Sequence, residues 1–155
     1  SIKKTFIETK ANMSGVSPTP YLIVKPDYFA YVPVTSRNGN KITIAHNETD
    51  NTYIVSSSYI VFYVNRPNIL DSDFLFMYFN RPEFDRYARY HSWGSAQEVF
   101  SWDAMCAIEL NLPSIEIQKK YVAVFKALLA NNNGTDDVSK ICPILVKGAI
   151  EEGGR

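Results

Sequence analysis

Two closely spaced pairs of acidic residues near the middle of the chain have the chemistry to hold a divalent metal ion for phosphodiester hydrolysis. They are Asp71 with Asp73, and Glu83 with Asp85. The first pair opens an expected helix, where the positive end of the helix dipole stabilises negative charge. The second pair falls on a helix face that we expect to be solvated. We therefore interpret both pairs as structural, with a metal-dependent nuclease or its remnant as an alternative.

Other catalytic chemistry has little support in the sequence. The chain has two histidines, His46 and His91, and neither lies near a nucleophile-elbow pattern. The glycine-rich cofactor loop and Asn/Asp-Pro-Pro-Tyr/Phe motif of a methyltransferase are absent from the sequence. Cys106 and Cys142 lie far apart in apolar stretches, so we expect buried reduced thiols and no zinc site. The sequence therefore predicts no catalytic residue, no metal and no cofactor, with the remnant of a metal-dependent nuclease or of a methyltransferase as an alternative.

Polar side chains at two expected turns have the chemistry of nucleic-acid recognition. Arginine and asparagine, here Arg37 and Asn38, can form paired hydrogen bonds with base edges. In the second turn, Gly94 would let the backbone approach a phosphate, and the Ser95 hydroxyl could donate to it. Polar residues are also normal at the turns of any soluble protein, so DNA contact and a plain solvated loop both stay open at this point.

The charge balance argues against a protein that holds DNA by bulk electrostatics. Sixteen Lys and Arg stand against 16 Asp and Glu in 155 residues. The balance is +4 over residues 1–47 (six basic, two acidic), −4 over 48–85 (two basic, six acidic) and zero over 86–155 (eight of each). One basic face with modest DNA affinity is compatible with this distribution.

No apolar run approaches the ~18 residues of a membrane span and no signal peptide is visible, so we expect a cytoplasmic protein.

The elements that must position these residues are strands in the first half of the chain and helices in the second. Runs rich in β-branched and aromatic residues predict strands over 5–10, 21–24, 28–34, 41–46 and 59–64. Asn38-Gly39 predicts a hairpin turn, because a type I′ turn needs positive φ at both central residues. Acidic residues at 71–73, Pro82 and Ser101 predict helices over 71–80, 82–90 and 102–106. This order indicates an α+β fold with a mixed, mostly antiparallel sheet.

The remaining elements complete one domain with a helical appendage. Residues 107–112 are predicted to form a returning strand, and Pro113-Ser114 to start the last long helix. Trp93 and Trp102 are expected in the core. Apolar residues in the two final helices recur at spacings of three and four, which is typical of a coiled-coil-like seam, and Pro143 should bend the second helix or delay its start. We expect this helical hairpin to form a subunit interface through Ile117, Tyr121, Val124, Leu128, Val138, Ile141 and Leu145.

The ordered series of motifs resembles the target recognition domain of a type I restriction–modification specificity subunit. The similarity runs from an entry strand at 6–15 through the 28–42 hairpin to residues 81–105, with their arginine-rich aromatic helix and Gly-Ser turn. It continues through the Leu112-Pro-Ser junction into the last helices. The chain departs from the family pattern where Gln97 replaces a frequent arginine, and in a short helical spacer and the absence of a second recognition domain.

The resemblance implies a non-catalytic specificity module, with a target recognition domain over 1–113 and a conserved-helix hairpin over 114–155. Its partners would be double-stranded DNA, of which it reads one half of a bipartite target, the methylation subunit and through it the restriction subunit, and a second recognition domain or a second copy. Arg86 and Arg89 could instead pair with Glu83 and Asp85, and a protein–protein module of the same fold without DNA reading stays open. The DNA contacts that the resemblance implies are Lys10, Asn12, Ser36, Arg37, Asn38, Asn40, Lys41, Arg86, Arg89, His91, Ser92, Gly94, Ser95 and Gln97.

Overall fold

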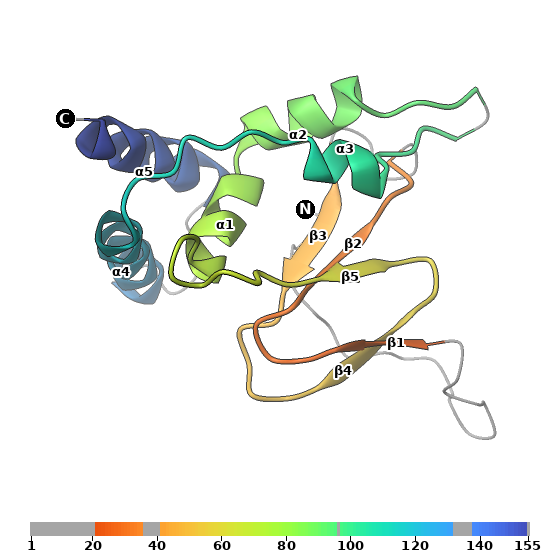
Figure 1. Cartoon of the computed structure of the whole chain (residues 1–155), viewed down its shortest axis with the longest axis horizontal. Helices are drawn as coiled ribbons and strands as arrows, with labels where there is room; N and C mark the ends of the chain where they lie inside the picture. The colour runs from red at the N-terminus through yellow and green to blue at the C-terminus, as the bar shows by residue number, and fades with distance from the viewer. Residues whose placement is uncertain (1–20, 36–40, 96, 132–137, 155) are drawn as a thin grey trace.

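A computed structural model describes residues 21–35, 41–95, 97–131 and 138–154 of the chain. In these ranges the chain forms five strands followed by five helices, which confirms the predicted α+β class (Figure 1). The predicted strand over 5–10, the Asn38-Gly39 turn and the helix break at 132–137 lie outside the described residues.

The centre of the fold is a three-stranded antiparallel sheet in the order β3–β2–β5. The strands are β2 (Phe29–Val32), β3 (Thr43–His46) and β5 (Ile60–Phe62). The β2–β3 ladder runs from Phe29 opposite His46 to Val32 opposite Thr43. These two strands are therefore antiparallel neighbours, as the predicted hairpin requires, although their ladder ends well before Asn38-Gly39.

A second, two-stranded antiparallel sheet pairs β1 (Tyr21–Val24) with β4 (Tyr53–Ser56). In Figure 1 this ribbon lies below β5, whereas α2 and α3 lie above it. Leu22, Ile23 and Ile54 on the ribbon are exposed. The strand β4 was not among the predicted strands, and its partner β1 has the predicted bounds.

Three helices cover the three-stranded sheet, namely α1 (Ser72–Phe79), α2 (Pro82–Tyr90) and α3 (Trp102–Cys106). The Asp71 carboxylate caps α1 by accepting from the Phe74 N–H, and the Ser101 hydroxyl caps α3 by accepting from the Ala104 N–H. Both caps satisfy backbone donors that the first turn of a helix leaves unpaired. The aromatic side chains of α1 pack on the sheet, with Phe79 edge-on to Phe29.

The chain ends in a helical hairpin of α4 (Ile115–Asn131) and α5 (Val138–Gly153). The hairpin is antiparallel, because Lys120 near the start of α4 pairs with Glu152 near the end of α5 at 2.7 Å. Its core is shared with α1, since Phe74 and Met77 pack with Val122 and Phe125 of α4 and with side chains of α5. The helix α1 therefore belongs to both hydrophobic cores and joins the body to the hairpin (Figure 1).

Several predictions about single elements are wrong. Residues 107–112 form no strand, although Ile108 and Leu110 pack on the core while Glu109 is exposed. The alternation of apolar and polar residues in this segment therefore reflects packing of one side on the core, without a neighbouring strand. Cys106 is exposed at the end of α3, whereas Cys142 is buried as predicted. Pro143 lies inside α5, which starts at Val138, so of its two expected effects, a bend or a delayed start, the delayed start does not occur.

Candidate nucleic-acid interface

The residues that flank the two predicted recognition turns are brought together at one end of the molecule. Residues just before the 36–40 loop bond to residues just after the 91–97 turn: the Thr35 N–H donates to the Glu98 carbonyl at 2.9 Å, and the Phe100 N–H to the Pro33 carbonyl at 2.8 Å. Val34 forms an antiparallel bridge with Val99. Segments about sixty residues apart in sequence are therefore held side by side.

A chain of hydroxyl hydrogen bonds connects these segments to the end of α2. The Thr35 hydroxyl lies 3.1 Å from the Ser92 hydroxyl, and the Ser92 hydroxyl donates to the Ala88 carbonyl at 2.6 Å. Ser92 therefore satisfies a carbonyl in the last turn of α2 while it contacts the β2 side of the interface. This network fixes where the 91–97 turn leaves the helix.

The chain that follows residues 36–40 is bonded to α2 by Asp85. Its carboxylate accepts from the Ile42 N–H at 3.1 Å, and both residues are buried. The prediction of a solvated position for Asp85 is therefore wrong, because the side chain satisfies a buried backbone donor. Glu83 is exposed as predicted and lies 3.5 Å from the Arg86 guanidinium, an exposed pair of small energetic value.

Gly94 has a structural role in the turn that is separate from any ligand. Its φ is +137°, a conformation that L side chains rarely adopt. A Cβ at this position would lie 2.1 Å from the Gln97 carbonyl oxygen. Trp93 and Val99 close the turn with reciprocal backbone hydrogen bonds of 3.2 and 3.0 Å, so the loop is narrow at its base.

The buried side chain of Tyr31 packs beneath this end of the molecule. The ring is fully buried, lies edge-on to Phe100, and its hydroxyl donates to the Phe100 carbonyl at 3.4 Å. Removal from solvent raises the pKa of the Tyr31 hydroxyl above its usual range, and proximity to Cys106 raises it further. The hydroxyl is therefore a neutral donor in the core, and we assign it no role in recognition.

The predicted contact residues that the structure describes all lie at this end. His91 and Ser92 are half-buried, and the others are exposed: Lys41, Arg86, Arg89, Gly94, Ser95 and Gln97. The remaining predicted contacts lie outside the described residues: Lys10, Asn12, Ser36, Arg37, Asn38 and Asn40.

Two aromatic residues at this end were missed by the sequence reasoning. Trp93, which was predicted to be in the core, is 75% exposed, and the neighbouring Tyr90 is 78% exposed. Trp102, which was also expected in the core, is exposed as well and packs against Phe62. A tryptophan that follows a helix and precedes a glycine turn carries no periodicity that distinguishes a core from a surface position.

The predicted subunit-interface residues lie beside the buried stripe of the hairpin. The buried residues of α4 are Gln118, Val122 and Phe125. Val124 is 43% exposed, and the other predicted positions are half-buried: Ile117, Tyr121, Leu128, Val138, Ile141 and Leu145. Ile144 on α5, which was not predicted, is 73% exposed. The hairpin therefore presents apolar side chains that its own core leaves uncovered.

The type I restriction modification DNA specificity domain is the family whose model matches this chain, over residues 1–137. The chain belongs to this family. Searches of the curated proteins and of the solved structures found no match. As a DNA specificity domain, the chain is of a class that is in general non-catalytic and that works with DNA and the restriction–modification complex. Within the described residues, every helix is too short or too polar to span a membrane.

Proposed function

We propose that this specificity domain reads one half of a bipartite DNA target. Recognition would use the end of the molecule formed by α2, the 91–97 turn and the residues that flank the 36–40 loop. The observation that supports the proposal is the backbone pairing of 33–35 with 98–100, which brings the residues that flank the two polar segments side by side. A major groove, about 12 Å wide, admits a helix such as α2.

The exposed side chains at this end have complementary tasks in the proposed contact. Arg86, Arg89 and Lys41 supply positive charge for phosphates, and arginine can also bind a guanine edge with two hydrogen bonds. Gln97 can pair with an adenine edge. Because the chain as a whole is neutral, the local charge must supply the electrostatic attraction.

We also propose that the helical hairpin docks the methylation subunit, and through it the restriction subunit, or a second recognition domain. The support is the apolar surface left uncovered on α4 and α5, with Val124 and Ile144 as its exposed members. Apolar side chains grouped on a helix pair favour burial against a further protein surface. The methyl donor would then bind the methylation subunit.

A salt titration of DNA binding tests the proposed interface. The whole chain would be titrated against a pool of random-sequence duplexes, with fluorescence anisotropy recorded at several salt concentrations. We expect the logarithm of the binding constant to fall linearly with the logarithm of salt concentration. Arg86→Gln and Arg89→Gln should each reduce the slope by about one if each side chain contacts one phosphate.

The control is Lys147→Gln on α5, which removes one exposed positive charge elsewhere on the molecule. This variant should leave the slope unchanged within error. Equal slopes for all variants, or binding without salt dependence, would contradict the placement of the interface and favour a protein–protein module.

A further inference from the structure

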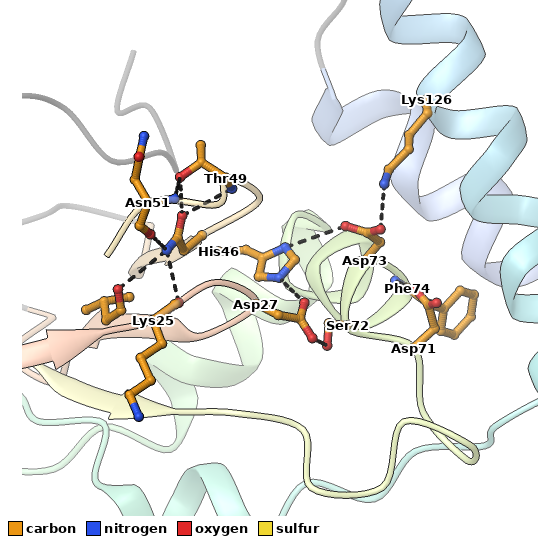
Figure 2. A network of polar contacts seen from close by, with 12 residues as sticks. Lys25, Asp27, His46, Thr49, Asn51, Asp71, Ser72, Asp73, Phe74 and Lys126 are labelled. Atoms are coloured by element: carbon orange, nitrogen blue, oxygen red, sulfur yellow. Dashed lines mark hydrogen bonds and ion pairs between the residues drawn. The ribbon is translucent and has the colours of Figure 1, made fainter. Parts of the chain in front are cut away.

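A buried histidine with one unpartnered ring nitrogen lies at the end of β3. His46 ends β3, and 2% of its side chain is exposed. Among the described residues, its Nδ1 atom has no hydrogen-bond partner. The nearest carboxylate oxygen, Asp73 Oδ1, lies 3.6 Å away, too far for a hydrogen bond. The dashed line between them in Figure 2 marks the ion pair that a protonated ring would form.

The other nitrogen of the ring is held by a carboxylate. His46 Nε2 lies 2.8 Å from Asp27 Oδ1, and the second Asp27 oxygen accepts from the Ser72 hydroxyl at 2.8 Å (Figure 2). Stacking of the ring on Phe29, with centroids 4.5 Å apart, fixes its plane. A carboxylate that accepts from one ring nitrogen sets the tautomer and turns the other nitrogen's lone pair outward, which is the arrangement found behind metal-ligating histidines.

Two carboxylates, those of Asp73 and Glu48, lie near the His46 ring. One ligand atom each from His46, Glu48 and Asp73 lie within 4.8 Å of one another. Bonds of about 2.0–2.2 Å to a tetrahedral ion place neighbouring ligand atoms about 3.3–3.6 Å apart, so the separation of His46 Nδ1 and Asp73 Oδ1 suits a shared ion. Glu48 is exposed, and the site is therefore open to ions from solvent on that side.

We propose that His46 Nδ1, Asp73 and Glu48 bind a divalent transition-metal ion of the zinc class. One imidazole and two carboxylates are ligands that such an ion accepts, and water can complete its coordination. Asp27 acts as a positioning residue that orients the imidazole. The ion joins the end of β3 to the first turn of α1, the helix that belongs to both hydrophobic cores.

A neighbouring lysine is expected to lower the metal affinity of the site by a measurable factor. Lys126 of α4 lies 2.6 Å from the second oxygen of Asp73, and this hydrogen bond raises the pKa of the lysine. The positive charge neutralises part of the site and opposes a cation. Lys126→Met should therefore tighten metal binding, by about threefold to tenfold at low salt.

Calorimetric titration of the metal-free whole chain with Zn²⁺ tests the site. We expect one equivalent to bind, and binding to raise the melting temperature. Asp73→Asn, Glu48→Gln and the positioning variant Asp27→Asn should each weaken binding by about tenfold or more. Asp103→Asn, which removes an exposed carboxylate from α3, is the matched control and should bind as the unaltered chain does.

Nitrogen chemical shifts of the two histidines provide a readout that does not depend on variants that fold poorly. Without metal, His46 should be the Nε2–H tautomer with a bare Nδ1, and Zn²⁺ should shift the Nδ1 resonance while His91 serves as internal reference. A His46 protonated on both nitrogens and indifferent to Zn²⁺ would overturn the proposal. So would Zn²⁺ affinity that Asp73→Asn and Glu48→Gln leave unchanged, or that Lys126→Met weakens.

Discussion

At the scale of single residues, the proposed recognition end depends on a few positions with narrow conformational requirements. Gly94 is the clearest, because its positive φ and its closeness to the Gln97 carbonyl exclude a side chain. Ser92 and Asp85 each satisfy backbone groups that would otherwise be unpaired at the base of a loop. Side chains that read DNA can be precise only if such residues hold their loops in place.

Gly94→Ala tests this requirement. We expect a loss of about 1–3 kcal/mol in the free energy of unfolding, because alanine at this φ is strained and its Cβ displaces the Gln97 carbonyl. DNA affinity should fall as well, since the turn must reshape. Gly154→Ala is the control, because a Cβ there meets its nearest atom at an ordinary 3.5 Å. Chemical denaturation and anisotropy measure the two effects, and a fully stable Gly94→Ala variant would contradict the account.

Single-residue burial shows where the sequence sufficed and where it did not. Asp71 and Ser101 were predictable as helix caps because capping depends on local chemistry alone. Asp85 was not, since its partner Ile42 lies 43 residues earlier and only the fold brings the two together. The same holds for the His46, Glu48 and Asp73 cluster. Its residues have no recognisable ligand spacing, so the sequence predicted no metal site.

At the scale of elements, hydrophobic pattern and turn residues predicted most strands and all five helices, but not the context of each. The strand β4 was missed because its pairing with β1 depends on a partner about thirty residues away. The segment 107–112 has strand-like alternation, yet no neighbouring strand supplies hydrogen bonds. The apolar seam predicted for α4 lies one position away from the residues that the helix buries, because Gln118 is buried along with apolar residues.

Gln118 joins α4 to the body and provides the prediction at this scale. The fully buried amide accepts from the Asp71 N–H at 2.9 Å and donates to the carbonyls of Ile69 and Pro113 at 2.9 and 2.8 Å. Gln118→Met keeps the shape of the side chain but leaves these groups without partners, so we expect a loss of about 3 kcal/mol or more in unfolding free energy. Lys119→Gln, on the exposed face, should change it by less than about 0.5 kcal/mol. Denaturant unfolding measures the stability of both variants. Equal free energies of unfolding for Gln118→Met and Lys119→Gln would contradict the role of Gln118.

At the scale of the whole molecule, the proposed DNA-reading end and the helical hairpin lie on different sides of a joint built around α1. Phe74 and Met77 of that helix pack in the hairpin core, while Leu75 and Phe79 pack in the body core. In the proposed function, this joint would fix the placement of the recognition end relative to the hairpin, and with it the position of the half-site. The proposed metal ion at the first turn of α1 would stiffen the same joint.

The central claim is that the α2 end of this domain selects a DNA half-site, and methylation mapping tests it most directly. A type I methylation assembly that contains this chain, shown by size-exclusion chromatography to be intact, would be expressed in cells whose genome is then read by long-read sequencing. We predict methylation at one bipartite motif, and loss or relaxation of one half-site with Arg86→Gln and Arg89→Gln combined. An intact assembly that methylates no motif, or the same motif with both arginines replaced, would contradict the account.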